Sequence, residues 1–525
     1  MRSPLSCRNS RIQVKITRDG PGGHVTIKPF FMKRIDNLLL CVAAFLAASC
    51  SAVITPDPPA PCGPVPTEDQ IAVQEMETYA FIHYSLNTYT GEEWGYGNED
   101  PALFNPAHLD AGQWARTCRE AGMKGIIFTA KHHCGFCMWP SAYTEYSVKN
   151  SPWKDGKGDV VAELAEACRK EGLKFAVYLS PWDRNHAEYG REAYVEYFRN
   201  QLTELLTGYG DMFEVWFDGA NGGNGWYGGA DETRQITKQY YGWATTYELV
   251  RSLQPHINVW GDPHEKSDMT WSGNERGYVG YPHWAPKRTD IDVTQDMREH
   301  GSEQGDKWIT SEADVSIRPG WFYHEYEDDK VKSLGQLMEI YCKSVGRNGT
   351  LLLNFPVNKD GLIHPADSIR GSEFRKMVES VFGNNLAKDA KAEADNVREK
   401  SRAFAASKVL DGKPSTYWAA DDDVLKASIV LDFGKELTFN RFMVQEHVRL
   451  GQRVRDFALE AMIDGEWQPL KDQYSAGGDG LQTIGYKRII CFPTVNATKL
   501  RFSILDSRAC PIISEMGVYF APDVE

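Results

Sequence analysis

Apolar and polar residues alternate along Glu214–Asp218. This period of two predicts a short β-strand. The strand stops at Gly219 and glycine-rich sequence follows, so a carboxylate is the last side chain of a mostly apolar strand. In a parallel α/β barrel, the carboxyl ends of the strands form the mouth where catalytic groups lie. Asp218 is therefore a candidate catalytic residue. The alternative, from the pattern alone, is that it caps a turn.

Similar strand-like runs alternate with helix-like runs through most of the first two-thirds of the chain. The predicted strands are 80–84, 125–133, 174–180, 214–218, 257–261, 308–312 and 350–355, and the predicted helices are 110–120, 160–171, 194–206, 240–253 and 331–345. This alternation predicts a (β/α)8 barrel. Strands are poorly marked over 262–330, so we expect a barrel that is either complete or distorted there.

Polar and aromatic side chains occupy the ends of the predicted strands. They are His83, His132, His133, Tyr178, Asp218 and Trp260. In a barrel these ends converge on one pocket. A single side chain of this kind is readily explained as structural, but several at successive strand ends are not. Imidazole, phenol and indole groups suit hydrogen bonding to sugar hydroxyls and stacking on a sugar face. The set therefore predicts a sugar-binding pocket.

The pattern changes after about residue 385. Residues 385–399 are polar and rich in alanine, which predicts a linker or a helix. Short strand-like runs then recur with turn residues between them, at 428–433, 441–444, 456–461 and 499–504. This pattern predicts an all-β sandwich. We place the barrel at 71–385 and the sandwich at 386–525.

The N-terminal part of the chain has the pattern of a targeting sequence. Basic residues follow Met32, an apolar run follows them, and small residues lead to Cys50. This is the pattern of a secretory signal, and the run is too short for an ordinary membrane span. We expect a lipoprotein-type signal peptide at 32–50 and a lipid on Cys50. The lipid would be the chain's sole membrane contact, in the periplasm or outer membrane of a Gram-negative bacterium. Residues 1–31 are then a mis-called start, and the proline-rich segment 51–70 is an extended tether.

Composition narrows the class of partner. The chain has 525 residues, 42% hydrophobic and 25% charged, with a formal net charge of −14. These values indicate a globular protein of two or three domains, and the lack of basic runs in its body argues against nucleic acid. Cys134 and Cys137 form a close pair beside two histidines, but no second ligand pair follows at a matching distance. We therefore expect no metal there.

Seven motifs then point to a known family. From about residue 78 to about residue 360 the chain carries, in order, FIHYSLNTYTGEEWG, AKHHCGFCMWPS, VYLSPWDRN, EVWFDGA, SGNERGY, SIRPGWFYH and LLLNFPVNKDGL. The ordered set resembles the retaining α-L-fucosidases of glycoside hydrolase family 29 along nearly the whole barrel. One motif departs from the family's KHHDGF, because Cys134 stands where the family has an acidic residue.

The resemblance implies roles for individual residues. Asp218 matches the family's nucleophile. Glu275 matches the acid/base of a subgroup that acts on α1,3- and α1,4-linked fucose, with Glu265 and Glu312 as rival acids. The other residues expected in the fucose pocket are His83, Trp94, His132, His133, Tyr178, Trp216, Arg318 and Trp321. Retention needs two carboxyl groups about 5–5.5 Å apart, one as nucleophile and one as acid/base. The resemblance thus implies an exo-acting hydrolase of fucosylated oligosaccharides or glycoconjugates that needs no cofactor for catalysis.

The C-terminal region carries a second resemblance. Residues 406–418, ASKVLDGKPSTYW, are similar to discoidin-like, galactose-binding modules. This likeness implies a structural calcium and a sugar site in the sandwich. The alternative is a packing domain that buttresses the barrel.

Two other functions remain open from the sequence. One is a cell-surface fucose-binding protein that has lost catalysis, and the other is a hydrolase of a related sugar such as L-galactose. The glycine-rich loop 222–229, with Trp226 and Tyr227, is expected either to stack on a branching sugar or to be a mobile loop. The sequence predicts no oligomeric state.

Overall fold

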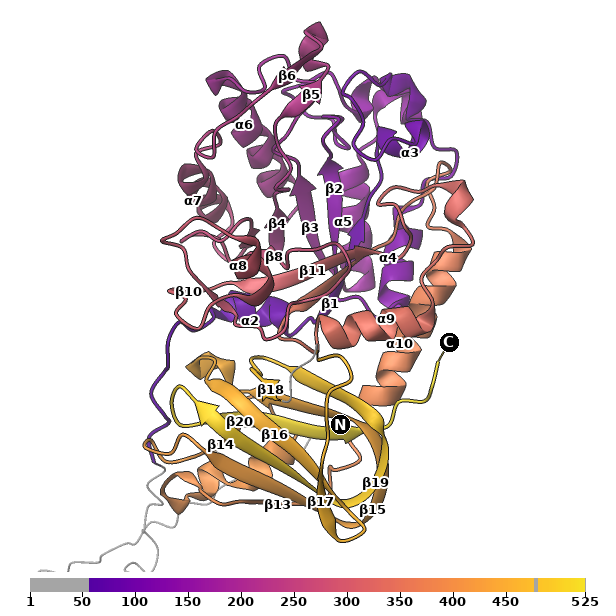
Figure 1. Cartoon of the computed structure of the whole chain (residues 1–525). Coiled ribbons are helices and arrows are strands. Elements are labelled where there is room, and N and C mark those ends of the chain that lie inside the picture. Colours follow the sequence, from indigo (N-terminus) through magenta and orange to yellow (C-terminus); the bar gives the residue numbers. More distant parts are fainter. Residues whose placement is uncertain (1–55, 476–479, 525) are drawn as a thin grey trace, which may run out of the picture. The chain divides into compact units, whose positions relative to one another are not determined.

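The computed structural model describes residues 56–475 and 480–524 (Figure 1). Within them, eight strands close a parallel barrel in the order β1-β12-β11-β8-β7-β4-β3-β2. The strands are β1 Thr78–Ile82, β2 Gly125–Lys131, β3 Lys174–Leu179, β4 Glu214–Trp216, β7 Asn258–Trp260, β8 Met269–Trp271, β11 Thr310–Ser316 and β12 Thr350–Asn354. The predicted barrel is confirmed, and it is complete, because β8 and β11 come from the weakly marked region 262–330.

Helices surround the barrel strands (Figure 1). They are α2 Glu68–Gln74, α3 Leu86–Thr90, α4 Ala111–Glu120, α5 Val160–Glu171, α6 Glu192–Gly208, α7 Trp243–Leu253, α8 Gln295–His300, α9 Leu334–Lys343 and α10 Pro365–Phe382. The five predicted helices are all present with ends within three residues. Helix α10 was not predicted. It buries few apolar side chains, among them Phe374 and Val381, so its helical period is weak.

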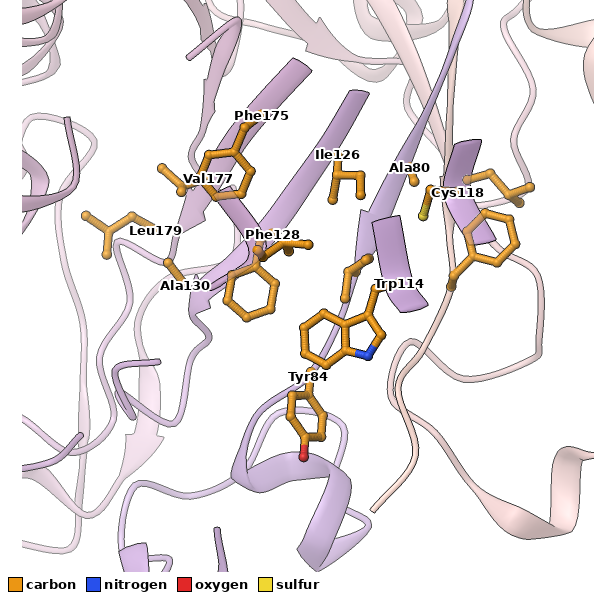
Figure 2. Packing of buried hydrophobic residues seen from close by; sticks show 14 of the residues in the cluster. Ala80, Tyr84, Trp114, Cys118, Ile126, Phe128, Ala130, Phe175, Val177 and Leu179 are labelled. Carbon is orange, nitrogen blue, oxygen red and sulfur yellow. The ribbon is translucent and has the colours of Figure 1, made fainter. Parts of the chain in front are cut away.

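Because side chains alternate along each strand, the barrel residues belong to two cores, one inside the barrel and one between the barrel and its helices. Phe81, Ile127 and Ala176 point into the barrel, whereas their neighbours Ala80 and Ile126 point outward. Figure 2 shows Phe128 of β2 near Trp114 of α4, with Phe175, Val177 and Leu179 of β3 in the same cluster of outward side chains. Burying one such aromatic or branched side chain contributes about 1.5–3 kcal/mol. Because both faces of the strands are covered, the strands read as almost continuous apolar runs.

Two barrel strands differ from their predicted bounds in ways that affect the site. Strand β4 ends at Trp216, so Asp218 lies two residues beyond the strand. Strand β11 continues past the predicted end at Glu312 to Ser316, which brings Asp314 into the barrel wall. β8 has only three residues and follows polar sequence, so its signal is weak.

The C-terminal domain is all-β. Its main sheet runs β14-β20-β15-β19-β16-β17, with β13 paired to β15 and β18 to β16. The strands are β13 Lys391–Ala394, β14 Trp418–Ala419, β15 Ala427–Glu446, β16 Val454–Ile463, β17 Glu466–Pro469, β18 Leu481–Gln482, β19 Arg488–Ser507 and β20 Ile512–Tyr519. The expectation of a linker or helix at 385–399 is wrong at β13. Its polar residues lie on a partly exposed strand that pairs with β15, so their composition does not reveal the strand.

Polar contacts join the β domain to the barrel. The Arg455 guanidinium donates to Glu303 at 2.9 and 2.6 Å, and Arg347 Nη2 donates to the carbonyl of Tyr474 at 2.7 Å. This packing is what a buttressing domain requires.

Residues 56–66 lie along the β domain ahead of α2. The N–H of Cys62 donates to the carbonyl of Leu450 at 3.0 Å, and Arg453 Nη2 donates to the carbonyl of Ala60 at 2.6 Å. The predicted signal peptide, the segment before it and the first part of the predicted tether lie outside the described residues. In the part of the chain that is described, no helix is both long enough and apolar enough to cross a membrane.

Candidate active site

A cavity of about 300 Å³ opens at the carboxyl ends of the barrel strands. It is lined by Phe81, His83, Glu93, Trp94, His132, His133, Trp216, Asp218, Gly219, Ala220, Trp260, Asp262, Trp271, Glu275, Arg298, Asp314 and Trp321. Eight of the ten residues predicted for the site are among them. The other two are not among the lining residues. The hydroxyl of Tyr178 donates to Asp218, which does line the cavity, whereas Arg318 forms an ion pair with Asp367 of α10.

Asp218 faces this cavity and is held from two sides. The backbone N–H of Ala220 donates to its Oδ1 at 2.7 Å, and the Tyr178 hydroxyl donates to its Oδ2 at 3.1 Å. Nε2 of His133 lies 3.7 Å from Oδ2. Burial, and then the charge of Asp218, raises the pKa of Tyr178 well above its ordinary value, so the phenol keeps its proton and donates. The contacts orient the carboxylate while its side chain stays 25% exposed.

Three imidazoles line the wall beside Asp218. Nδ1 of His83 lies 2.8 Å from Oδ1 of Asn354, and Nδ1 of His133 lies 2.7 Å from Oγ of Ser180. Burial lowers the pKa of His83 to about 3 and also lowers the pKa values of His132 and His133. All three rings are therefore neutral at neutral pH. A neutral imidazole has one donor and one acceptor nitrogen, which suits the hydroxyls of an uncharged sugar.

Indole rings supply the apolar surface of the cavity. Trp216 and Trp260 stack with ring centroids 3.9 Å apart and an interplanar angle of 26°. Trp94 is 53% exposed, and its ring lies 5.7 Å from that of His133. Trp321 lines the same cavity. Such faces stack on the C–H surface of a sugar ring.

Glu275 lies on a turn that follows β8. Gly273 adopts φ +90°, and a Cβ there would come within 2.8 Å of Cγ of Glu299 and 2.9 Å of Nε2 of Gln295. The Gln295 amide also donates to the carbonyl of Gly273 at 2.6 Å, so α8 holds the turn in place. Trp321 Nε1 donates to Oε2 of Glu275 at 3.4 Å. The turn therefore leaves an exposed carboxyl group on the cavity wall.

The rival acids lie outside the cavity. Glu312 is buried inside the barrel, where the Trp216 indole N–H donates to it at 2.7 Å and the Tyr79 hydroxyl also donates to it. It faces the buried carboxyl of Glu214, and burial raises the pKa values of both. Glu265 does not line the cavity either. Of the three candidates, Glu275 alone reaches the site.

Arg318 is placed away from the cavity. It is fully buried, its Nε donates to Asp367 at 2.9 Å, and its Nη1 donates to Asp328 at 2.7 Å. These ion pairs tie the segment that carries Trp321 to the first turn of α10. Arg318 thus supports the site from behind, because its Nε and Nη1 bind two carboxylates outside the cavity.

Cys134, which departs from the family motif, is also behind the cavity wall. Its Sγ donates to Oδ1 of Asn87 at 3.3 Å, and burial raises its pKa, so it stays a thiol. Among the residues that the structure describes, no three His, Cys, Asp or Glu side chains are grouped to hold a metal ion.

Several lining residues were absent from the predicted site. Besides Gly219 and Ala220, which follow Asp218, they are Phe81, Glu93, Trp260, Asp262, Trp271, Arg298 and Asp314. Trp260 was among the strand ends expected to converge on the sugar pocket, but not among the residues that the family resemblance implied. Asp262 follows the end of β7 as Asp218 follows β4, so the same signal was available. Asp314 continues the period of two from Glu312, but the strand was predicted to stop too early.

Comparisons with known proteins agree with this geometry. The alpha-L-fucosidase family model matches residues 65–374, and the F5/8 type C domain model matches residues 390–516. A putative alpha-L-fucosidase 1 from Oryza sativa subsp. japonica is 41% identical over 476 residues, which cover 89% of this chain and 87% of that protein.

Solved structures give the same result. A glycoside hydrolase 29 family member from an unknown rumen bacterium is 59% identical with a TM-score of 0.81, over 89% of this chain and 79% of that one. A Ruminococcus gnavus glycoside hydrolase 29 fucosidase in complex with fucose is 31% identical with a TM-score of 0.78, over 89% and 97%. The chain therefore belongs to the α-L-fucosidases of glycoside hydrolase family 29, with an F5/8 type C domain following the barrel.

Proposed function

We propose that this α-L-fucosidase works with retention, through a fucosyl-enzyme on Asp218 and with Glu275 as acid/base. A carboxylate oxygen of Asp218 attacks the anomeric carbon, while Glu275 gives its proton to the departing glycosidic oxygen. Glu275 then takes a proton from water, whose oxygen displaces Asp218 and releases fucose. The observation that carries the proposal is that Asp218 and Glu275 line one cavity, with Asp218 already oriented by Tyr178 and Ala220.

The remainder of the cavity suits a small, uncharged sugar. Its neutral imidazoles offer hydrogen bonds, and its indoles offer apolar faces. The fucose complex of the Ruminococcus gnavus enzyme supports fucose as the bound sugar. A fucose-binding protein without catalysis would not need an oriented carboxylate and a second carboxyl group in the same cavity. Release of fucose with retained configuration, followed by NMR, tests the proposal directly.

We further propose that the enzyme prefers α1,3- and α1,4-linked fucose on branched glycans. The Asn274-Glu275 motif supports this subgroup. Trp94 stands exposed at the mouth, and the Arg298–Asp262 ion pair at 2.8 Å also lines the cavity. The backbone N–H of Trp226 donates to the backbone carbonyl of Tyr96 at 3.1 Å. The glycine-rich loop 222–229 therefore lies next to the segment that carries Trp94. A branching galactose could bind across this surface.

A Trp226→Ala substitution tests the branch subsite. The ratio of kcat/KM for a Lewis trisaccharide over an aryl α-L-fucoside is expected to be well above one in the wild type. It should fall about tenfold in the variant, which corresponds to about 1.4 kcal/mol of lost stacking. Trp467→Ala on β17 is the matched control. A wild-type ratio near one would remove the subgroup, and a high ratio unchanged by Trp226→Ala would discard the loop as its cause.

A structural calcium in the β domain is a separate proposal. The Thr416 hydroxyl lies 2.8 Å from each carboxylate oxygen of Asp411, within hydrogen-bond distance of both. Glu515 lines a cavity together with Gly412, the residue after Asp411, and burial followed by the charge of Asp411 raises the pKa of Glu515 to about 7. Lys408 lies 3.5 Å from Asp411 and offsets only part of this charge. Calcium prefers such carboxylate, hydroxyl and carbonyl oxygens, so Asp411, Glu515 and Thr416 would hold it.

Calcium is accordingly expected to stabilise the protein. At a concentration 100 times the Kd, binding to the folded state adds about 2.7 kcal/mol, which should raise Tm by a few degrees. A chelator should reverse the shift, and Asp411→Ala should abolish it. A wild-type Tm that calcium and chelator leave unchanged would refute the site.

We also propose that the chain is exported and anchored through a lipid on Cys50, in the envelope of a Gram-negative bacterium. The apolar run followed by small residues before Cys50 supports this. Mass spectrometry of membrane-extracted protein should find a lipidated N-terminal Cys50, and Cys50→Ala should move the enzyme to the soluble fraction. An unmodified N-terminus elsewhere would contradict the anchor.

A further inference from the structure

Asp314 is a carboxyl group in the cavity for which the proposed reaction has no use. It lies on β11, two residues after Glu312, so both side chains point to the barrel axis. Its side chain is 5% exposed, yet it lines the cavity. Asp314 therefore reaches the sugar pocket from the barrel wall, whereas Glu275 reaches it from a turn.

The hydrogen bonding of Asp314 leaves one oxygen for a ligand. The indole N–H of Trp271 donates to Oδ1 at 2.9 Å. No other side chain in the described part of the chain donates to this carboxyl, and none forms an ion pair with it. Because Asp314 lines the cavity, a hydroxyl bound there can hydrogen-bond to Oδ2.

The surroundings of Asp314 favour its protonated form. Burial, and then the nearby carboxyl groups of Glu312 and Glu275, raises the pKa of Asp314 well above its ordinary value. The neutral carboxylic acid can donate one hydrogen bond and accept another. That capacity matches a sugar hydroxyl, which does both.

The position of β11 in the barrel indicates which part of the substrate Asp314 meets. Strands β4 and β11 are separated by β7 and β8 in the barrel order. Asp218 follows β4, so Asp314 lies across the cavity from it. A sugar ring attacked by Asp218 would present the hydroxyls of its other side to the β11 wall.

We propose that Asp314 is a further substrate-binding residue, whose free carboxyl oxygen hydrogen-bonds a ring hydroxyl of the bound fucose. The inference rests on the proposed function, since it takes fucose as the sugar in this cavity and Glu275 as the group that protonates the leaving oxygen. It assigns to Asp314 a contact with the fucosyl unit and none with the leaving group.

The test compares Asp314→Ala and Asp314→Asn on aryl α-L-fucosides and their 2-, 3- and 4-monodeoxy analogues. Asp314→Ala should lower kcat/KM on the parent fucoside about 10- to 100-fold, the effect of one lost hydrogen bond in a closed site. Against one deoxy analogue the same substitution should have almost no effect, because the hydroxyl that it contacts is already missing. Asp314→Asn is neutral and can still donate, so it should retain most of the activity.

A second readout is affinity for an iminosugar analogue of fucose, measured by calorimetry, which should weaken in Asp314→Ala and stay close to wild type in Asp314→Asn. Asp292→Asn is the control, because Asp292 is exposed and pairs only with Lys238 among the described residues. Equal losses on every deoxy analogue, or unchanged iminosugar affinity, would overturn the proposal. A loss in Asp314→Ala that grows with the pKa of the leaving phenol would also overturn it, since Asp314 would then serve the leaving group.

Failure of the proposed function would look different. In that case the loss of kcat/KM caused by Glu275→Ala, measured in parallel, would be the same for good and poor leaving groups. This result would not depend on what the deoxy analogues reveal about Asp314. If Asp314→Ala showed that dependence instead, the acid would be Asp314, and both assignments would fall together.

Discussion

Asp218→Ala is expected to lower kcat by about 10⁴- to 10⁶-fold, the range seen when a covalent nucleophile is removed. The reason is geometric as well as chemical. Tyr178 and the Ala220 amide hold the Asp218 carboxylate at the wall of the cavity, beside the imidazole of His133. A water molecule in its place would not form the fucosyl-enzyme. Steady-state kinetics with an aryl α-L-fucoside measures the loss.

Two controls separate loss of chemistry from loss of fold. The variant should keep the wild-type Tm within a few degrees, because the Asp218 side chain is partly exposed and the imidazole beside it, His133, has a pKa lowered by burial and so gives little ion pairing. Added azide should restore part of the turnover by attacking from the vacated side and should give a fucosyl azide. Near-wild-type turnover in Asp218→Ala would remove the nucleophile assignment.

Much of this site follows from strand periodicity. His83, His132, His133 and Asp218 were identified as side chains at the ends of apolar runs, and the structure brings all four to one cavity. The prediction works because the strands of a barrel are parallel and in sequence order, so their ends must converge.

The same reasoning fails where the local signal is weak or where a side chain's partner is distant. Asp314 was missed because β11 extends four residues past its predicted end. Arg318 was expected in the pocket with its neighbour Trp321, but its partners Asp367 and Asp328 lie in later sequence that carried no signal for them. A motif locates a segment but does not say which of its side chains turn inward.

Glu275 presents a harder problem, because its position in the sequence indicates only a surface turn. Its placement in the cavity depends on α8, which holds the turn through Gln295, and on the indole of Trp321. Neither contact is local in sequence. The resemblance to the family supplied the assignment, and the structure supplies a physical reason for it.

Glu275→Ala is therefore the second decisive variant. Loss of a general acid/base contributes about 10²- to 10⁴-fold, so kcat/KM on natural glycans should fall by that range. On an aryl fucoside with a strongly acidic phenol the formation of the fucosyl-enzyme needs little proton assistance, so kcat/KM should fall far less. Azide should then speed turnover, because it attacks the fucosyl-enzyme without giving up a proton.

The matched control is Glu265→Ala, which changes the rival acid that lies outside the cavity and should leave kcat/KM near wild type on every substrate. The informative quantity is the loss of kcat/KM on substrates with poor leaving groups relative to the loss on substrates with good ones. A merely structural defect would lower kcat/KM by the same factor on both kinds of substrate. If Glu275→Ala lowered both by the same factor and azide had no effect, Glu275 would position the substrate without transferring a proton. The acid would then have to be sought among the other cavity carboxyls, Glu93, Asp262 and Asp314.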